Sequence, residues 1–268
     1  MQQRAQKQLV SSLIGKTMLI MGILNITPDS FADGGRYNSF ESAIRHAREM
    51  IAEGVDIIDI GGESTRPGAE RVSEDEEMAR VIPVITELAK DGVRISIDTM
   101  RASTALAAIA AGAHIVNDVS GGLADPAMLE TVAAVKTPYI AMHWRGASKD
   151  MNSRAIYTDV VADVISELKA RISAAIDAGI TKENLIIDPG LGFAKEAAHN
   201  WEIIDHIDEF VALGHRVLVG GSRKRFLGGD SPDGREAASI ALTKRLSTSG
   251  IWGVRVHSVK AHKEMLSL

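Results

Sequence analysis

The sequence VRISIDTMRASTALAAIAAGAHIVND, residues 93–118, contains two short β-branched runs joined by an alanine-rich segment. The runs at 93–98 and 114–118 have the length and apolar content of buried strands. Between them, residues 99–110 place apolar side chains at three- and four-residue spacing, which predicts a helix. We therefore expect this stretch to form a strand–helix–strand unit.

The same alternation extends along the whole chain. Strands are predicted at 19–24, 55–60, 93–98, 114–118, 139–143, 185–188, 216–220 and 252–257. Helices are predicted at 40–52, 74–89, 99–110, 126–134, 157–178, 200–213, 234–249 and 257–268. Eight strand–helix units in about 250 residues, with no linker rich in proline or glycine, predict an α/β fold of the (β/α)8 TIM barrel type. The predicted barrel is a single domain over residues 1–268, with residues 1–16 as an N-terminal lead-in segment.

A doubly wound open sheet is the alternative fold. Such a sheet usually carries a nucleotide-binding loop after its first strand. Residues 25–35 occupy that place here and read NITPDSFADGG. They contain neither GxGxxG nor GxxxxGK[ST], so the phosphate cradle of dinucleotide and P-loop proteins is missing. The barrel is therefore favoured.

Composition limits the possible partners and the cellular location. The 268 residues are 45% hydrophobic and 24% charged, which is typical of a globular protein and excludes disorder. The net charge of -5 predicts no attraction of the whole molecule to nucleic acid or anionic lipid. The absence of cysteine excludes disulfides and thiol nucleophiles and suits the cytoplasm. No apolar run approaches the ~18 residues of a membrane span.

Polar residues stand at the ends of all the predicted strands or directly after them. In strand order they are Asn25, the segment 61–66, Asp98, Asn117 with Asp118, His143, Asp188, the segment 222–225, and Arg255 with His257. Taken singly, Asp98 or Ser222 could cap a helix and Asp188 could open a turn. Helix caps and turns do not explain why both carboxylates and cations follow these strands. Because the carboxyl ends of barrel strands share one mouth, we expect a functional site there.

The mixture of side chains suits a flat heterocycle with an anion beside it. Carboxylates accept hydrogen bonds from ring N–H and amino groups, whereas Asn117 can donate and accept and Lys224 donates. Arg255 and His257 lie two residues apart on one strand, so they point the same way and are interpreted as an anion clamp. Asn25 offers a neutral oxygen of the kind that Mg²⁺ accepts.

Several blocks of sequence then match one family. They are MGILNITPDSFADGG (21–35), GGESTRPGA (61–69), SIDT (96–99), NDVSGG (117–122), MHWRG (142–146), DPGLGFAK (188–195), GGSRKRFLG (220–228) and VRVH (254–257). In these blocks, their order and their spacing, the chain resembles the dihydropteroate synthases of folate biosynthesis. The resemblance covers nearly the whole chain.

The resemblance implies a reaction and a role for each matched residue. The reaction condenses (7,8-dihydropterin-6-yl)methyl diphosphate with p-aminobenzoate to give 7,8-dihydropteroate and pyrophosphate. The implied catalytic residues are Asn25, Asp98, Lys224, Arg255 and His257. The implied contacts to pterin and pyrophosphate are Thr65, Asp98, Asn117, Asp188, Lys224, Arg255 and His257. The implied p-aminobenzoate pocket comprises Phe31, Thr65, Arg66, Pro67, Phe193, Ser222 at the start of a helix, and Arg225.

The family resemblance also implies a mechanism, a cofactor and an assembly. Pyrophosphate leaves the pterin methylene early, and the aryl amine attacks a cation-like centre. Mg²⁺ near Asn25 is the implied cofactor, and with Arg255 and His257 it would stabilise the departing anion. Asp98 would offset positive charge on the pterin. A homodimer is also expected.

Two positions depart from the family pattern, and two other functions remain as alternatives. Ser258 stands where many members have Asp, and Arg225 stands where many have Ser. One alternative is a methyltetrahydrofolate-dependent methyltransferase, which would not need Asn25 or the clamp of Arg255 and His257. The other is a non-catalytic pterin-binding homologue, which loss of a matched residue would favour. None of the matched residues is lost.

Overall fold

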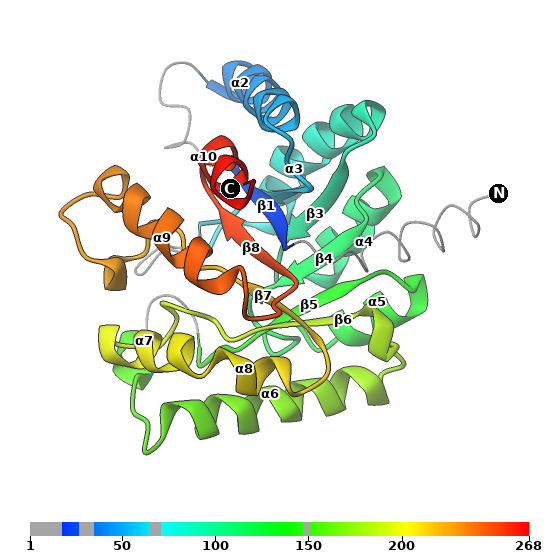
Figure 1. The fold of residues 1–268 in the computed structure, drawn as a ribbon. Helices are drawn as coiled ribbons and strands as arrows, with labels where there is room; N and C mark the ends of the chain where they lie inside the picture. Colours follow the sequence, from blue (N-terminus) through cyan, green and yellow to red (C-terminus); the bar gives the residue numbers. More distant parts are fainter. Residues whose placement is uncertain (1–17, 27–34, 65–70, 147–150, 268) are drawn as a thin grey trace.

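The computed structural model describes residues 18–26, 35–64, 71–146 and 151–267, and for 35–39 and 151–152 it describes the backbone. Its parallel strands close into one barrel in chain order, β1 to β8 (Figure 1). The strands are β1 Leu19–Asn25, β2 Ile57–Gly61, β3 Arg94–Asp98, β4 Ile115–Asp118, β5 Tyr139–Met142, β6 Leu185–Asp188, β7 Arg216–Val219 and β8 Gly253–Val256. The barrel prediction is confirmed, and the open sheet is excluded because β1 pairs with β8. The expected lead-in segment, residues 1–16, lies outside the described residues.

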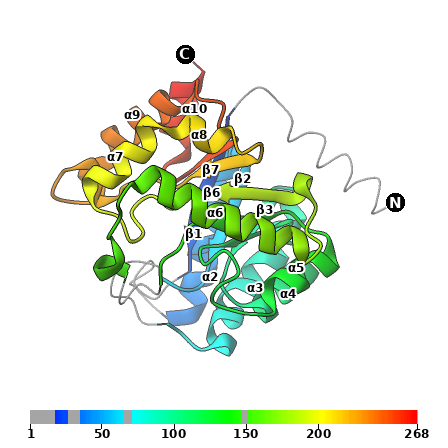
Figure 2. The same ribbon diagram turned by 90° about the horizontal axis from the view of Figure 1, so that it is seen from below.

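Helices surround the strands, as Figures 1 and 2 show from two directions. They are α2 Gly35–Ala52, α3 Glu74–Leu88, α4 Ala102–Ala111, α5 Met128–Val135, α6 Val160–Asp177, α7 Ala197–Asp205, α8 Ile207–Val211, α9 Glu236–Leu246 and α10 Val259–Leu266. The predicted helix at 200–213 is in fact two helices, because the backbone of His206 leaves the helical region at φ -114° and ψ 29°. The other boundaries shift by a few residues.

The barrel interior is apolar below its mouth. Seven side chains fill it: Met21, Ile57, Ile115, Ile140, Ile186, Leu218 and Trp252. A larger apolar cluster, which includes Ile58 and Ile60 of β2, packs between the strands and the helices. Because side chains alternate along a strand, Asp59 and Gly61 share the inward face of Ile57. Asp59 and Gly61 therefore lie above the apolar filling.

The register of the first four strands aligns four of their residues at one level. Asn25 pairs with Gly61, Gly61 with Asp98, and Asp98 with Asn117. A Cβ on Gly61 would lie 3.6 Å from Asp98 Oδ2 and 3.7 Å from Asn25 Oδ1, so both oxygens border the space above this glycine. Strand pairing alone thus gathers three of the predicted site residues at the mouth.

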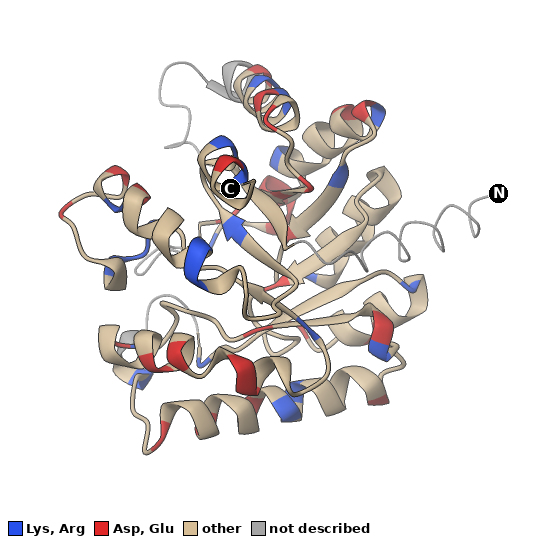
Figure 3. Ribbon diagram, viewed as in Figure 1, with Lys and Arg blue, Asp and Glu red and all other residues tan. Residues whose placement is uncertain are grey.

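The outer helices carry charged residues of both signs. Figure 3 shows acidic and basic residues interspersed along outer helices such as α2 and α6. Among the described helices, none combines the length and the hydropathy that a membrane span requires.

Candidate active site

The structure gathers the predicted residues at the mouth of the barrel. Asp98, Asn117 and Arg255 are linked through hydrogen bonds to one another or to Asp59, while Asp188 and Lys224 lie close enough to interact electrostatically. A Cβ on Gly220 would lie 3.6 Å from Asp188 Oδ2 and 3.9 Å from Arg255 Cβ, so β6 and β8 contribute to the same space. The side chains that the sequence suggested do converge.

Arg255 is held between two carboxylates. Its Nε donates to Asp59 Oδ2 at 2.5 Å, and its Nη2 donates to Asp98 Oδ2 at 2.7 Å. Burial works to lower the pKa of Arg255, but the charges of Asp59 and Asp98 outweigh it and raise that pKa. Neither bond uses Nη1. The orientation of Arg255 thus follows from its bonds to these two carboxylates.

Asp98 is an ion-pair partner, and its alternative interpretation as a helix cap is wrong. Helix α4 begins at Ala102, after a turn in which Arg101 N donates to Thr99 Oγ1 at 3.1 Å. Burial raises the pKa of Asp98 to about 7, against the opposing charge of Arg255 and with a further increase from Asp59. This carboxyl therefore titrates near neutral pH.

Asp59 is a site residue that the sequence interpretation did not identify. Its side chain is fully buried, and its Oδ2 accepts from Asn117 Nδ2 at 3.0 Å as well as from Arg255. The sequence feature that could have indicated Asp59 is an acidic residue at an inward position of the apolar run 55–60.

Asp118 has a different role. It accepts from Tyr139 Oη at 2.7 Å and from Ser120 N at 2.8 Å, so it shapes the turn after β4.

Asp188 and Lys224 form the second charged group at the mouth. Burial raises the pKa of Asp188 against the opposing charge of Lys224, and burial lowers the pKa of Lys224 to about 8 against the charge of Asp188. Asp188 also opens a turn, as one interpretation proposed, because its Oδ1 accepts from Gly190 N at 2.7 Å. Lys224 Nζ donates to Leu191 O and lies 4.5 Å from the ring centre of Phe193.

Two glycines after β6 allow this packing. Gly190 and Gly192 have φ of 69° and 76°, in the left-handed region that favours glycine. A Cβ on Gly190 would lie 2.5 Å from His143 O, and one on Gly192 would lie 2.8 Å from Lys224 Cδ. Side chains at these positions would therefore displace the neighbouring strand end or the lysine.

The helix expected to start at Ser222 is absent from its place. Residues after β7 form a turn in which Arg223 has φ 59°, followed by a short 3-10 helix at Arg225–Leu227, and α9 begins only at Glu236. The left-handed Arg223 is held from α9, since Ser239 Oγ accepts from its backbone N at 2.9 Å. Ser222 Oγ instead lies 3.1 Å from His257 Nδ1, which joins the turn to the end of β8.

The two departures from the family pattern have different surroundings. Ser258 precedes α10, yet its hydroxyl does not cap that helix and donates to Glu236, which also accepts from Arg223 Nε at 2.7 Å. Arg225 is exposed and Phe193 is half-buried at the mouth. The remaining expected p-aminobenzoate residues, Phe31, Thr65, Arg66 and Pro67, lie outside the described residues.

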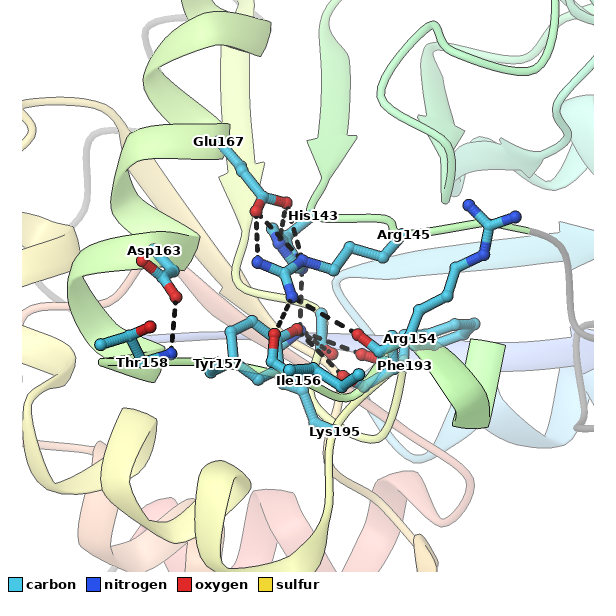
Figure 4. Close-up of polar contacts among 12 residues, drawn as sticks. His143, Arg145, Arg154, Ile156, Tyr157, Thr158, Asp163, Glu167, Phe193 and Lys195 are labelled. Carbon is cyan, nitrogen blue, oxygen red and sulfur yellow. Dashed lines mark hydrogen bonds and ion pairs between the residues drawn. The ribbon is translucent and has the colours of Figure 1, made fainter. Parts of the chain in front are cut away.

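A second polar network surrounds His143 beside the mouth (Figure 4). His143 is buried, its Nε2 lies 2.9 Å from Glu167 Oε2, and its Nδ1 lies 2.9 Å from Lys195 Nζ. Since the carboxylate can only accept and the ammonium can only donate, the histidine carries its proton on Nε2. Lys195 also donates to Gly190 O at 3.0 Å and to Phe193 O at 3.1 Å, so it holds the loop that Lys224 contacts at Leu191 O. The sequence interpretation did not identify Lys195.

Burial and neighbouring charges shift the pKa values of His143, Lys195 and Glu167. Burial, helped by the charge of Lys195, lowers the pKa of His143 to about 4. Burial lowers the pKa of Lys195 to about 7. The hydrogen bond from His143 lowers the pKa of Glu167 to about 2, and Arg145 adds to this effect through a bond of 2.5 Å. At neutral pH the network therefore pairs a neutral histidine with a carboxylate.

The side chains present suit a magnesium ion that takes most of its ligands from substrate and water. In the parts of the chain that the structure describes, no group of three or more His, Cys, Asp or Glu residues could hold a metal. Asn25 provides a neutral oxygen at the mouth, whereas the neighbouring Asp98 is already paired with Arg255. A single neutral ligand is compatible with Mg²⁺ bound through phosphate oxygens.

Comparisons with known proteins show the family of the chain. The family model described as pterin binding enzyme matches residues 21–257. The dihydropteroate synthase of Mycobacterium leprae (strain TN) is 48% identical over 259 residues, 93% of this chain and 91% of that protein. The solved structure of Xanthomonas albilineans dihydropteroate synthase with 4-aminobenzoic acid has a TM-score of 0.88 and 42% identity, covering 94% of this chain and 91% of that one.

A further solved structure is that of the Yersinia pestis dihydropteroate synthase with a sulfonamide drug complex. It has a TM-score of 0.88 and 40% identity, and the match covers 94% of this chain and 92% of that one. The chain therefore belongs to the family of pterin binding enzymes, and within it to the dihydropteroate synthases. The resemblance stated from the sequence blocks is confirmed, and these relatives favour neither alternative function.

Proposed function

We propose that the chain condenses (7,8-dihydropterin-6-yl)methyl diphosphate with p-aminobenzoate at the mouth of the barrel, giving 7,8-dihydropteroate and pyrophosphate. The observation that carries this proposal is the ion pair of Asp98 with Arg255 in the same opening as the oppositely charged Asp188 and Lys224. This arrangement supports binding of a polar ring next to the site where an anion departs.

The pterin ring is recognised by groups of opposite hydrogen-bonding character. Asp188 accepts from the amino and ring N–H groups, and Lys224 donates to a ring carbonyl or nitrogen. An ammonium has three N–H donors, so Lys224 can keep its bond to Leu191 O while it contacts the ring. Asn117 directs its amide nitrogen to Asp59, which leaves its carbonyl oxygen as an acceptor for the ring.

The departing pyrophosphate is stabilised on the other side of the mouth. Arg255 offers Nη1, the nitrogen that neither of its carboxylate bonds uses. His257 is held next to Ser222, with 3.1 Å between Nδ1 and Oγ. Asn25 would hold Mg²⁺, which when bound supplies positive charge against the leaving group. Together these groups lower the energy of charge that develops in the transition state.

Asp98 has a different part in the reaction. As pyrophosphate leaves, positive charge spreads over the pterin, and an ionised carboxylate nearby offsets it. Its pKa of about 7, set by burial against the charge of Arg255, keeps a substantial ionised fraction at neutral pH. The incoming amine attacks this cation-like centre, so the protein need not form a covalent bond with the substrate.

The p-aminobenzoate is expected to bind at the rim formed by the loops after β6 and β7. Phe193 presents a half-buried ring there, and Ser222 and Arg225 follow β7. The exposed Arg225 is suited to a carboxylate because its guanidinium can donate two parallel hydrogen bonds. The family resemblance adds four residues to the proposed p-aminobenzoate pocket: Phe31, Thr65, Arg66 and Pro67.

A homodimer and a cytoplasmic location are proposed as well. The homodimer rests on the family resemblance, and the apolar side of α9 does not supply its surface, because Leu242 and Leu246 are buried in the core. The location rests on the absence of cysteine. Sedimentation velocity tests the dimer, and fractionation of cells that express the chain tests the location.

One assay tests the function. The purified chain is incubated with the pterin diphosphate, and pyrophosphate release is followed with and without p-aminobenzoate and with and without Mg²⁺. We expect release that depends on the amine and the metal, together with formation of 7,8-dihydropteroate. Release of pyrophosphate without any pteroate product would contradict the proposal.

A further inference from the structure

Asp59 stands apart from the other buried residues of the barrel interior. It is an acidic side chain with no exposed surface, one step below the mouth on the inward face of β2. A carboxylate in such a place loses its hydration and is kept only where other groups compensate it. Its Oδ2 has two partners, whereas its Oδ1 is buried and makes no hydrogen bond within the described residues. An apolar side chain at position 59 would continue the apolar cluster of the barrel interior, so packing alone does not explain why this residue is an aspartate.

The two partners of Asp59 come from strands that do not pair with β2. Arg255 lies on β8 and Asn117 on β4, while β2 pairs with β1 and β3. One oxygen of Asp59 therefore joins two distant strands across the interior. It meets Asn117 on the side where the mouth begins, since Asn117 stands at the level of Asp98 and Gly61.

The bonds to Asp59 set the orientation of both partners. Because a carboxylate oxygen only accepts, the amide of Asn117 must turn its NH2 group toward Asp59 and its carbonyl oxygen away. Arg255 is fixed at Nε by Asp59 and at Nη2 by Asp98, which defines the direction in which Nη1 points. Without Asp59, the amide could flip and the guanidinium would keep a single partner.

We propose that Asp59 is a positioning residue for the condensation, which orients Asn117 toward the pterin ring and Arg255 toward the diphosphate. This inference rests on the proposed function and adds a residue to it. Asp59 acts through its two partners and does not touch the substrate. Its loss should therefore weaken the interaction with the pterin diphosphate and leave the binding of p-aminobenzoate unchanged.

The test compares three variants by steady-state kinetics. Asp59→Leu removes the acceptor while it keeps a similar shape, and Asp59→Asn keeps one carbonyl oxygen for both partners. Ser96→Ala is the matched control, because Ser96 is the register partner of Asp59 on β3, is equally buried, and makes no side-chain hydrogen bond within the described residues. We expect the KM for the pterin diphosphate to rise about 30-fold in Asp59→Leu and less than about 5-fold in Asp59→Asn.

The KM for p-aminobenzoate separates positioning from a general loss of structure. We expect it to stay within about 2-fold of wild type in all three variants, as should both KM values of Ser96→Ala. A pterin KM in Asp59→Leu within about 2-fold of wild type, or equal impairment of Asp59→Asn and Asp59→Leu, would overturn the inference. If Asp59→Leu does not fold, Asp59→Ser replaces it, and the same limits apply because its short hydroxyl cannot span both partners.

Failure of the proposed function would look different. In that case the wild-type chain itself would form no pteroate. Equilibrium dialysis of a pterin without the diphosphate then still tests Asp59, since Asn117 faces the ring. We expect Asp59→Leu to bind this pterin about 10-fold more weakly than wild type, and equal binding would overturn the inference.

Discussion

Arg255 on β8 and Asp98 on β3 form an ion pair inside the barrel, with 2.7 Å between Nη2 and Oδ2. With Asp59 as its second partner, Arg255 compensates two buried carboxylates. It therefore contributes to stability as well as to the proposed binding of pyrophosphate. A substitution of Arg255 must be interpreted with both roles in mind.

Replacing Arg255 with alanine should destabilise the fold strongly at alkaline pH. Removing one partner of a buried ion pair leaves an uncompensated charge, which costs about 3–5 kcal/mol. At pH 5 the loss should be smaller, because the raised pKa of Asp98 lets this carboxyl take up a proton. Urea unfolding at pH 8 and pH 5 measures both values. Arg245→Ala is the control, since its pair with Asp205 is about half exposed and should contribute less than about 1 kcal/mol.

Replacing Lys224 with methionine should remove most of the affinity for pterin. The variant keeps the aliphatic stem but loses the ammonium, whose charge interacts with that of Asp188, so we expect about 100-fold weaker binding of a pterin without diphosphate. Isothermal titration calorimetry measures the affinity, with the exposed Lys244→Met as control. Unchanged affinity in Lys224→Met would mean that the ring binds elsewhere.

Replacing Gly192 with alanine should weaken pterin binding through Lys224. Gly192 has φ 76°, and its new Cβ would lie 2.8 Å from Lys224 Cδ, so the lysine must move. Gly214→Ala is a matched control, because Gly214 has the same φ of 76° and its Cβ would face Lys182 Nζ at 3.4 Å. Both variants should lose about 1–2 kcal/mol of unfolding free energy from backbone strain. Only Gly192→Ala should also lose pterin affinity, and an equal affinity in the two variants would contradict the role of this glycine.

His143 should make the fold sensitive to mild acid. Its pKa is lowered by burial and by Lys195 from 6.5 to about 4, so the folded state binds fewer protons than the unfolded state between these values. Its contribution is therefore complete above pH 6.5 and is lost as the pH falls toward 4. The loss amounts to about 3 kcal/mol at roughly 1.4 kcal/mol per pKa unit.

The variant His143→Gln tests this dependence. Its unfolding free energy should fall by about 3 kcal/mol less than that of wild type between pH 6.5 and pH 4. His206→Gln is the control, because a hydrogen bond with the Glu202 carbonyl raises the pKa of the exposed His206, so its stabilising effect changes only above pH 6.5. Parallel curves for wild type and His143→Gln would show that folding does not lower the pKa of this histidine.

A sulfonamide should compete with p-aminobenzoate and not with the pterin substrate. The related Yersinia pestis enzyme has been solved in a sulfonamide drug complex. Inhibition kinetics at varied concentrations of each substrate distinguish the two pockets. Competition with the pterin diphosphate alone would mean that the proposed positions of the pockets are reversed.

The order of strands and helices could be predicted because it follows from local patterns. The runs at 93–98 and 114–118 are apolar over strand length, and the alanine-rich segment between them has helical spacing. Residues that follow such strands, for example Asn25 and Asp188, meet at one mouth in any parallel barrel. The fold class, the family and the face of the barrel on which the candidate residues meet could therefore be predicted from the sequence.

The partners of each side chain were not available, because they depend on how distant strands come together. Arg255 was interpreted together with its neighbour His257, yet closure of the barrel places it against Asp59 and Asp98. Ser222 was expected to begin a helix, but contacts of Arg223 with Ser239 hold a turn there.

Asp59 and Lys195 looked like ordinary charged residues in the sequence. Burial gives them their importance, since Asp59 joins β4 to β8 and Lys195 holds the loop after β6 against His143. Periodicity is a property of residues that are neighbours in the sequence. It predicted the strands and helices, and with them the barrel mouth at which the candidate residues meet. Hydrogen bonds, ion pairs and pKa shifts depend on distances in space, and only the closed barrel fixes those distances.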